Sequence, residues 1–132
     1  MEKLTSTSLI AQIIKYKRKE IYYVDYSNIK EVETFLAAIE QAVQFREKNI
    51  HKNNKSDILL MVNFENSSIY GDAMIKLIEI NNQIDAVIQK KAIFGFNTTT
   101  EIIFKSINKL LDKPFKTFNT MEEAKNWLAS TN

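Results

Sequence analysis

Polar side chains that could take part in chemistry gather in three places, each directly after a predicted strand. They are Asp25-Tyr26-Ser27-Asn28, Asn63 with Glu65–Ser68, and Asn97-Thr98-Thr99. Asp25 and Glu65 are the two carboxylates that acid–base catalysis or a metal ion would use, and glycosidase-type chemistry needs such a pair roughly 5–10 Å apart. Ser, Thr, Asn and Asp also favour turns and helix caps, so a purely structural role is the alternative for each of them.

The sequence lacks the side-chain combinations of common catalytic centres. Its single histidine, His51, lies in the polar segment Lys48–Lys55, far along the chain from Asp25 and Glu65. It has no Ser/His/Asp order, no H-E-x-x-H and no glycine-rich phosphate loop. Cysteine is absent, which excludes disulfides, thiolate metal sites and cysteine catalysis. We therefore expect no catalytic residues, no metal and no cofactor; a hydrolase or transferase built on the two carboxylates is the less favoured alternative.

Composition indicates one ordinary globular domain over residues 1–132. The chain is 45% hydrophobic and 26% charged, and its net charge of +2 gives no strong field to attract nucleic acid. The basic segments Lys15–Lys19 and Arg46–Lys55 are explained by a solvated turn and a helix end. No secretory h-region and no apolar run of about 20 residues is present. We expect a cytoplasmic protein with no membrane insertion and no nucleic-acid partner.

Alternating strands and helices would position the polar groups. The predicted strands are Ile10–Tyr16 and Glu20–Tyr26, which form a hairpin around Lys17-Arg18-Lys19, followed by Ile58–Phe64, Ala92–Phe96 and Phe115–Phe118. Ile58–Phe64 is too apolar to alternate, so we expect it to be covered on both faces.

Four helices are expected between and after these strands. They begin with the capping pattern Asn28–Glu31, at about Gly71, with the capping box Thr98–Glu101, and at Thr120. The first carries Val32, Leu36, Ile39 and Val43 on its inner face, and the third carries Ile103, Ile107, Leu110 and Leu111 and ends at Pro114. The segment Gln83–Gln89 remains ambiguous.

The resulting order is β-β-α-β-α-β-α-β-α, an α/β domain with a mixed sheet. In such sheets ligands gather beyond the carboxyl ends of the strands. The candidate partner-binding rim at this edge consists of Asp25, Tyr26, Ser27, Asn63, Glu65, Asn66, Ser67, Ser68, Tyr70 and Asp72. Most aromatic residues are expected in the core, and Tyr70 is the exception because it lies in a loop.

Four segments of the chain resemble a known family. They are EIYYVDY (Glu20–Tyr26), LLMVNFENSS (Leu59–Ser68), KKAIFGF (Lys90–Phe96) and FNTMEEAKNWL (Phe118–Leu128). In this order they resemble the STAS group, specifically its SpoIIAA-like branch of small bacterial domains. The closing F-x-T-x-E-E-A-x-x-W-L is the most distinctive piece. The resemblance extends from about Ile10 to Leu128 and implies the same strand–helix alternation.

The resemblance also implies a role in regulation by protein binding. The best-understood STAS members are anti-sigma-factor antagonists, which bind a partner kinase and are switched by phosphorylation of a serine in a motif like D-S-S-G-L. The corresponding place here reads Tyr70-Gly71-Asp72-Ala73-Met74, so Asp72 or Ala73 stands where the serine would be. Ser67 and Ser68 lie several residues earlier. We therefore expect the usual phosphoserine switch to be missing.

These observations lead to one hypothesis and one alternative. The first is a non-catalytic bacterial regulatory domain that binds a protein partner through the rim, with a homodimer also conceivable through its sheet edges. The alternative is a carrier of a small apolar or lipid-like ligand in a cleft between sheet and helices. The Ile- and Phe-rich inner faces and Tyr70 suggest that alternative.

Overall fold

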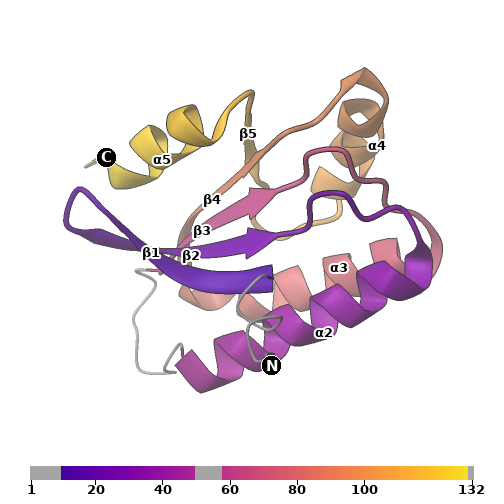
Figure 1. The fold of residues 1–132 in the computed structure, drawn as a ribbon, viewed down its shortest axis with the longest axis horizontal. Helices are drawn as coiled ribbons and strands as arrows, with labels where there is room; N and C mark the ends of the chain where they lie inside the picture. Colours follow the sequence, from indigo (N-terminus) through magenta and orange to yellow (C-terminus); the bar gives the residue numbers. More distant parts are fainter. Residues whose placement is uncertain (1–9, 50–57, 131–132) are drawn as a thin grey trace, which may run out of the picture.

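The computed structural model describes residues 10–49 and 58–130, and a five-stranded sheet forms its framework (Figure 1). The strands are β1 (Ala11–Tyr16), β2 (Lys19–Asp25), β3 (Ile58–Asn63), β4 (Ile88–Phe94) and β5 (Lys116–Phe118). Their order in the sheet is the order along the chain. β1 runs antiparallel to β2, and the other three pairings are parallel. The expected hairpin and mixed sheet are confirmed.

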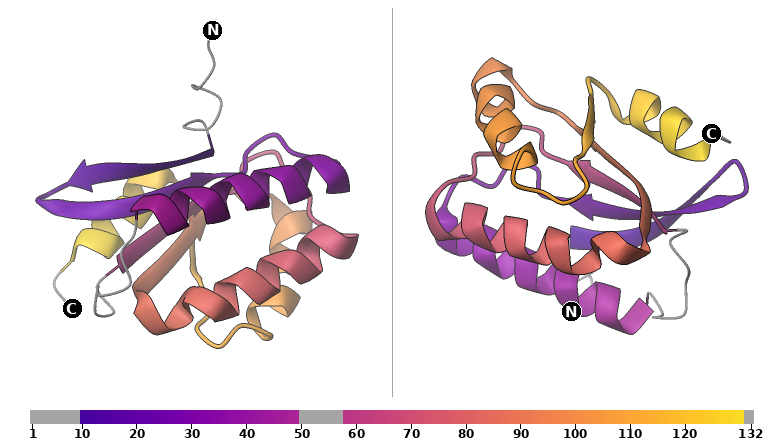
Figure 2. Two further views of the ribbon diagram at one scale, coloured as in Figure 1. Left: turned by 90° about the horizontal axis from the view of Figure 1, so that it is seen from below. Right: turned by 180° about the vertical axis from the view of Figure 1, so that it is seen from behind.

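Helices cover both faces of this sheet. They are α2 (Val32–Asn49), α3 (Gly71–Ile84), α4 (Thr98–Asn108) and α5 (Met121–Ala129), with the short 3-10 helix η1 (Asp85–Val87) after α3. α2 and α3 lie side by side on one face, and α5 lies on the other (Figures 1 and 2). The end of α3, η1 and the start of β4 occupy the segment Gln83–Gln89 that the sequence left ambiguous. Most of the predicted loop Lys48–Lys55, including His51, lies outside the described residues.

Alternation along β2 and β3 divides the core in two. Tyr22, Val24, Leu60 and Val62 belong to the larger cluster with α2 and α3, whereas Ile21, Tyr23, Leu59 and Met61 belong to the smaller cluster with α5. All six residues of β3 are buried. This confirms the prediction that the central strand is covered on both faces.

A row of aromatic rings extends the larger cluster to α4 and β5. Phe64 contacts Phe35 at 5.6 Å and Phe96 at 5.4 Å between ring centroids. Phe104 of α4 contacts Phe96 at 4.9 Å and Phe115 at 5.6 Å. These separations are those of favourable offset and edge-to-face pairs. The aromatic residues thus hold α4, which lies apart from α2 and α3, to the end of the sheet.

Two predicted helix starts are displaced. Asn28 does not cap α2, because its backbone is left-handed (φ 62°) and its side-chain oxygen accepts a hydrogen bond from Asn66 at 2.7 Å. α2 begins at Val32 instead. α4 is capped by Asn97 rather than Thr98, since Asn97 Oδ1 accepts from Thr100 N at 2.9 Å and Thr100 Oγ1 accepts from Asn97 N at 3.0 Å. The capping box therefore starts one residue earlier than predicted.

The predicted inner face of α4 is also partly wrong. Ile103 and Leu110 are 38% and 63% exposed, while Phe104 and Ile107 are buried. The helix ends at Asn108, well before Pro114. After Asn108 the backbone continues in tighter turns, in which Leu110 N donates to Ile107 O at 2.9 Å. The Asn108 side chain donates to Phe115 O and accepts from Phe115 N, at 3.0 and 2.8 Å, and so fixes the segment that follows.

A buried ion pair connects η1 to the segment around Lys113, which follows α4. Lys91 Nζ lies 2.9 Å from Asp85 Oδ1, with the two side chains 0% and 7% exposed. Asp85 Oδ2 accepts from Lys113 N at 2.9 Å, and Lys91 also donates to Lys113 O. Burial lowers the pKa of Lys91, and the Asp85 carboxylate opposes this effect. Each charge therefore depends on the other to remain buried.

Removing one partner of this pair should destabilise the fold strongly. We expect Asp85→Asn to lower the free energy of unfolding by about 3–5 kcal/mol, because it leaves the buried Lys91 charge uncompensated. Urea unfolding measures this. The matched control is Lys76→Met, which breaks the exposed Lys76–Glu79 pair and should change stability by about 0.5 kcal/mol or less. Equal effects of the two substitutions would contradict this role of the buried pair.

Candidate functional site

The loops after β2 and β3 are joined into one unit at the carboxyl edge of the sheet. Three backbone hydrogen bonds of 2.9 Å connect them: Tyr26 N to Asn63 O, Asn28 N to Glu65 O, and Ser68 N to Ile29 O. Asn66, like Asn28, has a left-handed backbone (φ 53°), and the side chains of these two residues are hydrogen-bonded. Because most loop polar groups are paired with each other, this edge is rigid and pre-arranged.

The ten residues of the predicted rim separate into two sets. The side chains that are exposed or half-buried are Asp25, Ser27, Glu65, Asn66, Ser68, Tyr70 and Asp72, and the buried ones are Tyr26, Asn63 and Ser67. Ser67 Oγ donates to Phe64 O at 2.9 Å, and Asn63 Oδ1 accepts from Glu65 N at 2.9 Å. Ser67 and Asn63 therefore shape the loop, and a partner would meet only the first set.

The charges of Asp25 and Glu65 both act on the hydroxyl of Tyr23, but of the two only Asp25 lines the groove beside α2. Burial raises the pKa of Tyr23, the hydrogen bond from Asn63 opposes this, and the charges of Asp25 and Glu65 add to the rise. Asp25 accepts a turn hydrogen bond from Ser27 N at 2.9 Å. It also lines a groove of about 410 Å³ beside α2, which Glu65 does not line.

The acid–base alternative gains no support from this arrangement. A catalytic pair of carboxylates must reach the same substrate, and the groove beside Asp25 would give access to one of them only. Within the described ranges, no three His, Asp or Glu side chains gather as metal ligands.

Tyr70 and Asp72 stand at the start of α3. The Tyr70 hydroxyl donates to Lys30 O at 3.1 Å, so Tyr70 connects the loop before α3 to the loop before α2 and remains 49% exposed. Asp72 is exposed in the first turn of α3. A carboxylate there interacts favourably with the positive end of the helix dipole.

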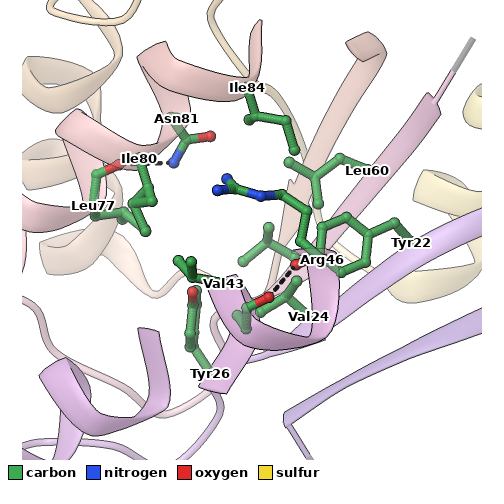
Figure 3. Close-up of a pocket in the computed structure, with 12 residues that line it drawn as sticks. Tyr22, Val24, Tyr26, Val43, Arg46, Leu60, Leu77, Ile80, Asn81 and Ile84 are labelled. Carbon is green, nitrogen blue, oxygen red and sulfur yellow. Dashed lines mark hydrogen bonds between the residues drawn. The ribbon is translucent and has the colours of Figure 1, made fainter. Parts of the chain in front are cut away.

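A small cleft lies between α2 and α3, above β2 and β3 (Figure 3). Its volume is about 40 Å³. Apolar side chains make up most of its lining: Val24, Leu60 and Val62 from the sheet, Ala42 and Val43 from α2, and Leu77, Ile80 and Ile84 from α3. Tyr22, Tyr26, Arg46 and Asn81 are its polar members.

Two of these polar side chains, Tyr26 and Arg46, form no hydrogen bond with a side chain or backbone group of the described residues. Tyr22 donates to Ala42 O and Asn81 Nδ2 donates to Leu77 O, both at 2.9 Å. Tyr26 is 3% exposed, and its hydroxyl has no hydrogen bond to any described residue. The Arg46 side chain reaches into the middle of the cleft (Figure 3). Tyr26 thus belongs to the cleft by its side chain, although its backbone is part of the rim.

Sequence reasoning did not identify Arg46 or Asn81 as candidate site residues. Arg46 follows Ala42 by four positions and Val43 by three, so it lies on the inward stripe of α2 as a charged residue among apolar ones. That interruption of the stripe is the signal that could have indicated it. The equivalent signal for Asn81 is its position four residues after Leu77 on the inner face of α3.

The comparisons with known proteins give a fold. No protein-family model matches the sequence, and the curated proteins contain no significant match. The structure is similar to that of an uncharacterized protein of the DUF3478 family from Shewanella loihica PV-4, described as having a SpoIIAA-like fold. The TM-score is 0.69, with 15% sequence identity over 90% of this chain and 92% of the other.

The fold is SpoIIAA-like. The family resemblance noted in the sequence is therefore confirmed at the level of the fold, and the expected α/β class with it. At 15% identity the similarity carries no site or partner from the Shewanella protein to this chain. None of the described helices is both long and apolar enough to cross a membrane.

Gly95 allows the loops after β3 and β4 of this SpoIIAA-like fold to approach closely, and substituting it should lower the free energy of unfolding. Its φ is +99°, and a Cβ there would lie 2.5 Å from Glu65 Cγ and 2.7 Å from Glu65 N. Gly71 also has a positive φ of +61°, but the nearest atom to its Cβ would be Val32 Cγ2 at 3.7 Å. We expect Gly71→Ala to cost about 1–2 kcal/mol from backbone strain alone, and Gly95→Ala to cost clearly more in urea unfolding. Equal costs would show that the Glu65 contact is unimportant.

Burial of tyrosines in the cleft should make the fold sensitive to alkali. Burial raises the pKa of Tyr22 and Tyr26, and Arg46 opposes both shifts. The folded state therefore keeps protons that the unfolded chain releases above about pH 10. Stability should be unaffected below pH 10 and fall above it by about 1.4 kcal/mol per pH unit for each tyrosine. In urea unfolding between pH 9 and 11, Tyr26→Phe should lose less stability than the wild type; parallel losses would contradict the burial of this hydroxyl.

Proposed function

We propose that this protein is a non-catalytic regulatory domain that binds a protein partner through the exposed part of the rim. The observation that supports this most directly is the rigid pair of loops, whose paired backbone groups leave Glu65, Tyr70 and Asp72 facing solvent. A surface arranged before binding loses little conformational entropy when a partner arrives.

The charge of this surface suggests the kind of partner. Asp25, Glu65 and Asp72 are acidic, and complementary potentials speed association with a basic surface. Asp72 is an acidic residue at the start of α3, where Asp72 or Ala73 stands in place of the serine that the resemblance implies is phosphorylated in the STAS antagonists. We infer that partner binding here proceeds without that serine switch.

Reversing two rim charges should test this proposal. We expect Glu65→Lys/Asp72→Lys to reduce recovery of the partner by roughly tenfold in quantitative affinity purification from cells that produce the protein, because like charges would then oppose each other. Glu47→Lys is the matched control, since Glu47 is exposed near the opposite end of α2. Undiminished recovery by the double variant would exclude this surface.

The cleft supports a second candidate function, binding of a small amphipathic ligand. The supporting observation is the pairing of an apolar lining with the unpartnered Tyr26 hydroxyl and the Arg46 guanidinium. Its volume of about 40 Å³ limits the ligand. An apolar cavity that binds benzene measures about 150 Å³, so a lipid-like chain would enter only if α2 and α3 moved apart. A short molecule matches the cleft as it stands.

A further inference from the structure

We propose that the cleft between α2 and α3 binds a short-chain aliphatic monocarboxylate, whose carboxylate is held by Arg46 and Tyr26. This inference rests on the second candidate function, because it names the ligand class of that same cleft. Its basis is the chemistry of the two polar groups and the size of the apolar space around them.

Arg46 supplies the positive charge. Its side chain is half-buried and points into a cleft that is otherwise mainly apolar (Figure 3). It forms no ion pair with any described carboxylate. A guanidinium presents planar N–H groups that match a carboxylate and form charge-assisted hydrogen bonds with it. An anion in the cleft would therefore supply the counter-charge that the described residues do not.

Tyr26 supplies a hydroxyl donor on the same space. Tyr26 is only 3% exposed, and its hydroxyl, which has no hydrogen bond to a described residue, belongs to the lining of the cleft. Arg46 lines the same cleft; burial raises the pKa of Tyr26, and the charge of Arg46 opposes the rise. The hydroxyl is therefore protonated near neutral pH and able to donate to a carboxylate oxygen.

The volume and the apolar side chains of the cleft determine which body a bound carboxylate can have. A volume of about 40 Å³ corresponds to roughly three water molecules at 10–15 Å³ each, which is room for the carboxylate group, so the few carbons beyond it would lie at the open mouth of the cleft. Val24, Leu60 and Ile80 offer no hydrogen bonds to a hydroxylated chain. Arg46 is the only cationic side chain among the residues that line this cleft, so it balances a single negative charge. These features favour a monoanion with an aliphatic body, of which butyrate is the simplest probe.

Titration with sodium butyrate, followed by two-dimensional NMR of the ¹⁵N-labelled protein, tests the inference. We expect saturable shifts of resonances from residues lining the cleft, with Kd of about 1 mM or tighter, a modest value for a six-atom ligand. Butyramide is the neutral control of the same shape and should bind at least roughly tenfold more weakly, because it lacks the charge that Arg46 recognises.

Two variants assign the recognition to named atoms. Arg46→Met keeps an apolar stem but removes the charge, and should weaken butyrate binding at least roughly tenfold while leaving butyramide binding unchanged. Tyr26→Phe should also weaken butyrate binding, and because it removes only an unpartnered hydroxyl the fold should be preserved. Lys48→Met removes an exposed charge from the same helix and should leave binding as in the wild type.

The outcomes separate the inference from the function on which it rests. Equal binding of butyrate and butyramide, or full butyrate affinity in Arg46→Met, would overturn carboxylate recognition while leaving a small-ligand function standing. Absence of cleft shifts with either compound, in a protein whose spectrum shows it to be folded, would overturn both.

Discussion

Burial of β3 on both faces is the constraint on which the rest of the structure depends. All six of its residues are buried, so one layer of helices must cover each side of the sheet. α2 and α3 form one layer and α5 the other (Figures 1 and 2). Because β2 and β4 both pair with β3 in parallel, the carboxyl ends of all three strands meet at one edge. The rim and the cleft are both consequences of this arrangement.

The two candidate sites meet at a single residue. Tyr26 follows β2 directly, and its backbone N–H belongs to the hydrogen bonds that join the strand-end loops. Its side chain turns to the α2–α3 side of the sheet and closes one end of the cleft. Its neighbours Asp25 and Ser27 remain at the rim. The two candidate sites are therefore adjacent in the chain: the side chain of Tyr26 lines the cleft, and those of its neighbours on both sides belong to the rim.

Local sequence patterns predicted the order of the elements, the two-sided burial of β3 and the Thr120 cap of α5, all of which depend on residues close together in the chain. They failed where a distant residue decides the outcome. The side chain of Asn28, which was predicted to cap a helix, binds Asn66 instead, and the side chain of Asn108, the last residue of α4, binds Phe115. The position of Arg46 in the cleft depends on how α2 lies against α3, which periodicity within either helix does not determine.

The ties between the strand-end loops also set the spacing of α2 and α3 at one end. The hydrogen bonds from Asn28 to Glu65, from Ser68 to Ile29 and from Tyr70 to Lys30 all lie just before the first turns of the two helices. Arg46 and Ile84 lie in the last turns. The last turns are held by different contacts: α3 leads directly into η1 and the buried Asp85–Lys91 pair, and Tyr22 donates to Ala42 O of α2 at 2.9 Å. The spacing of the two helices is therefore set at the rim end by bonds between loops and at the Arg46 end by side chains.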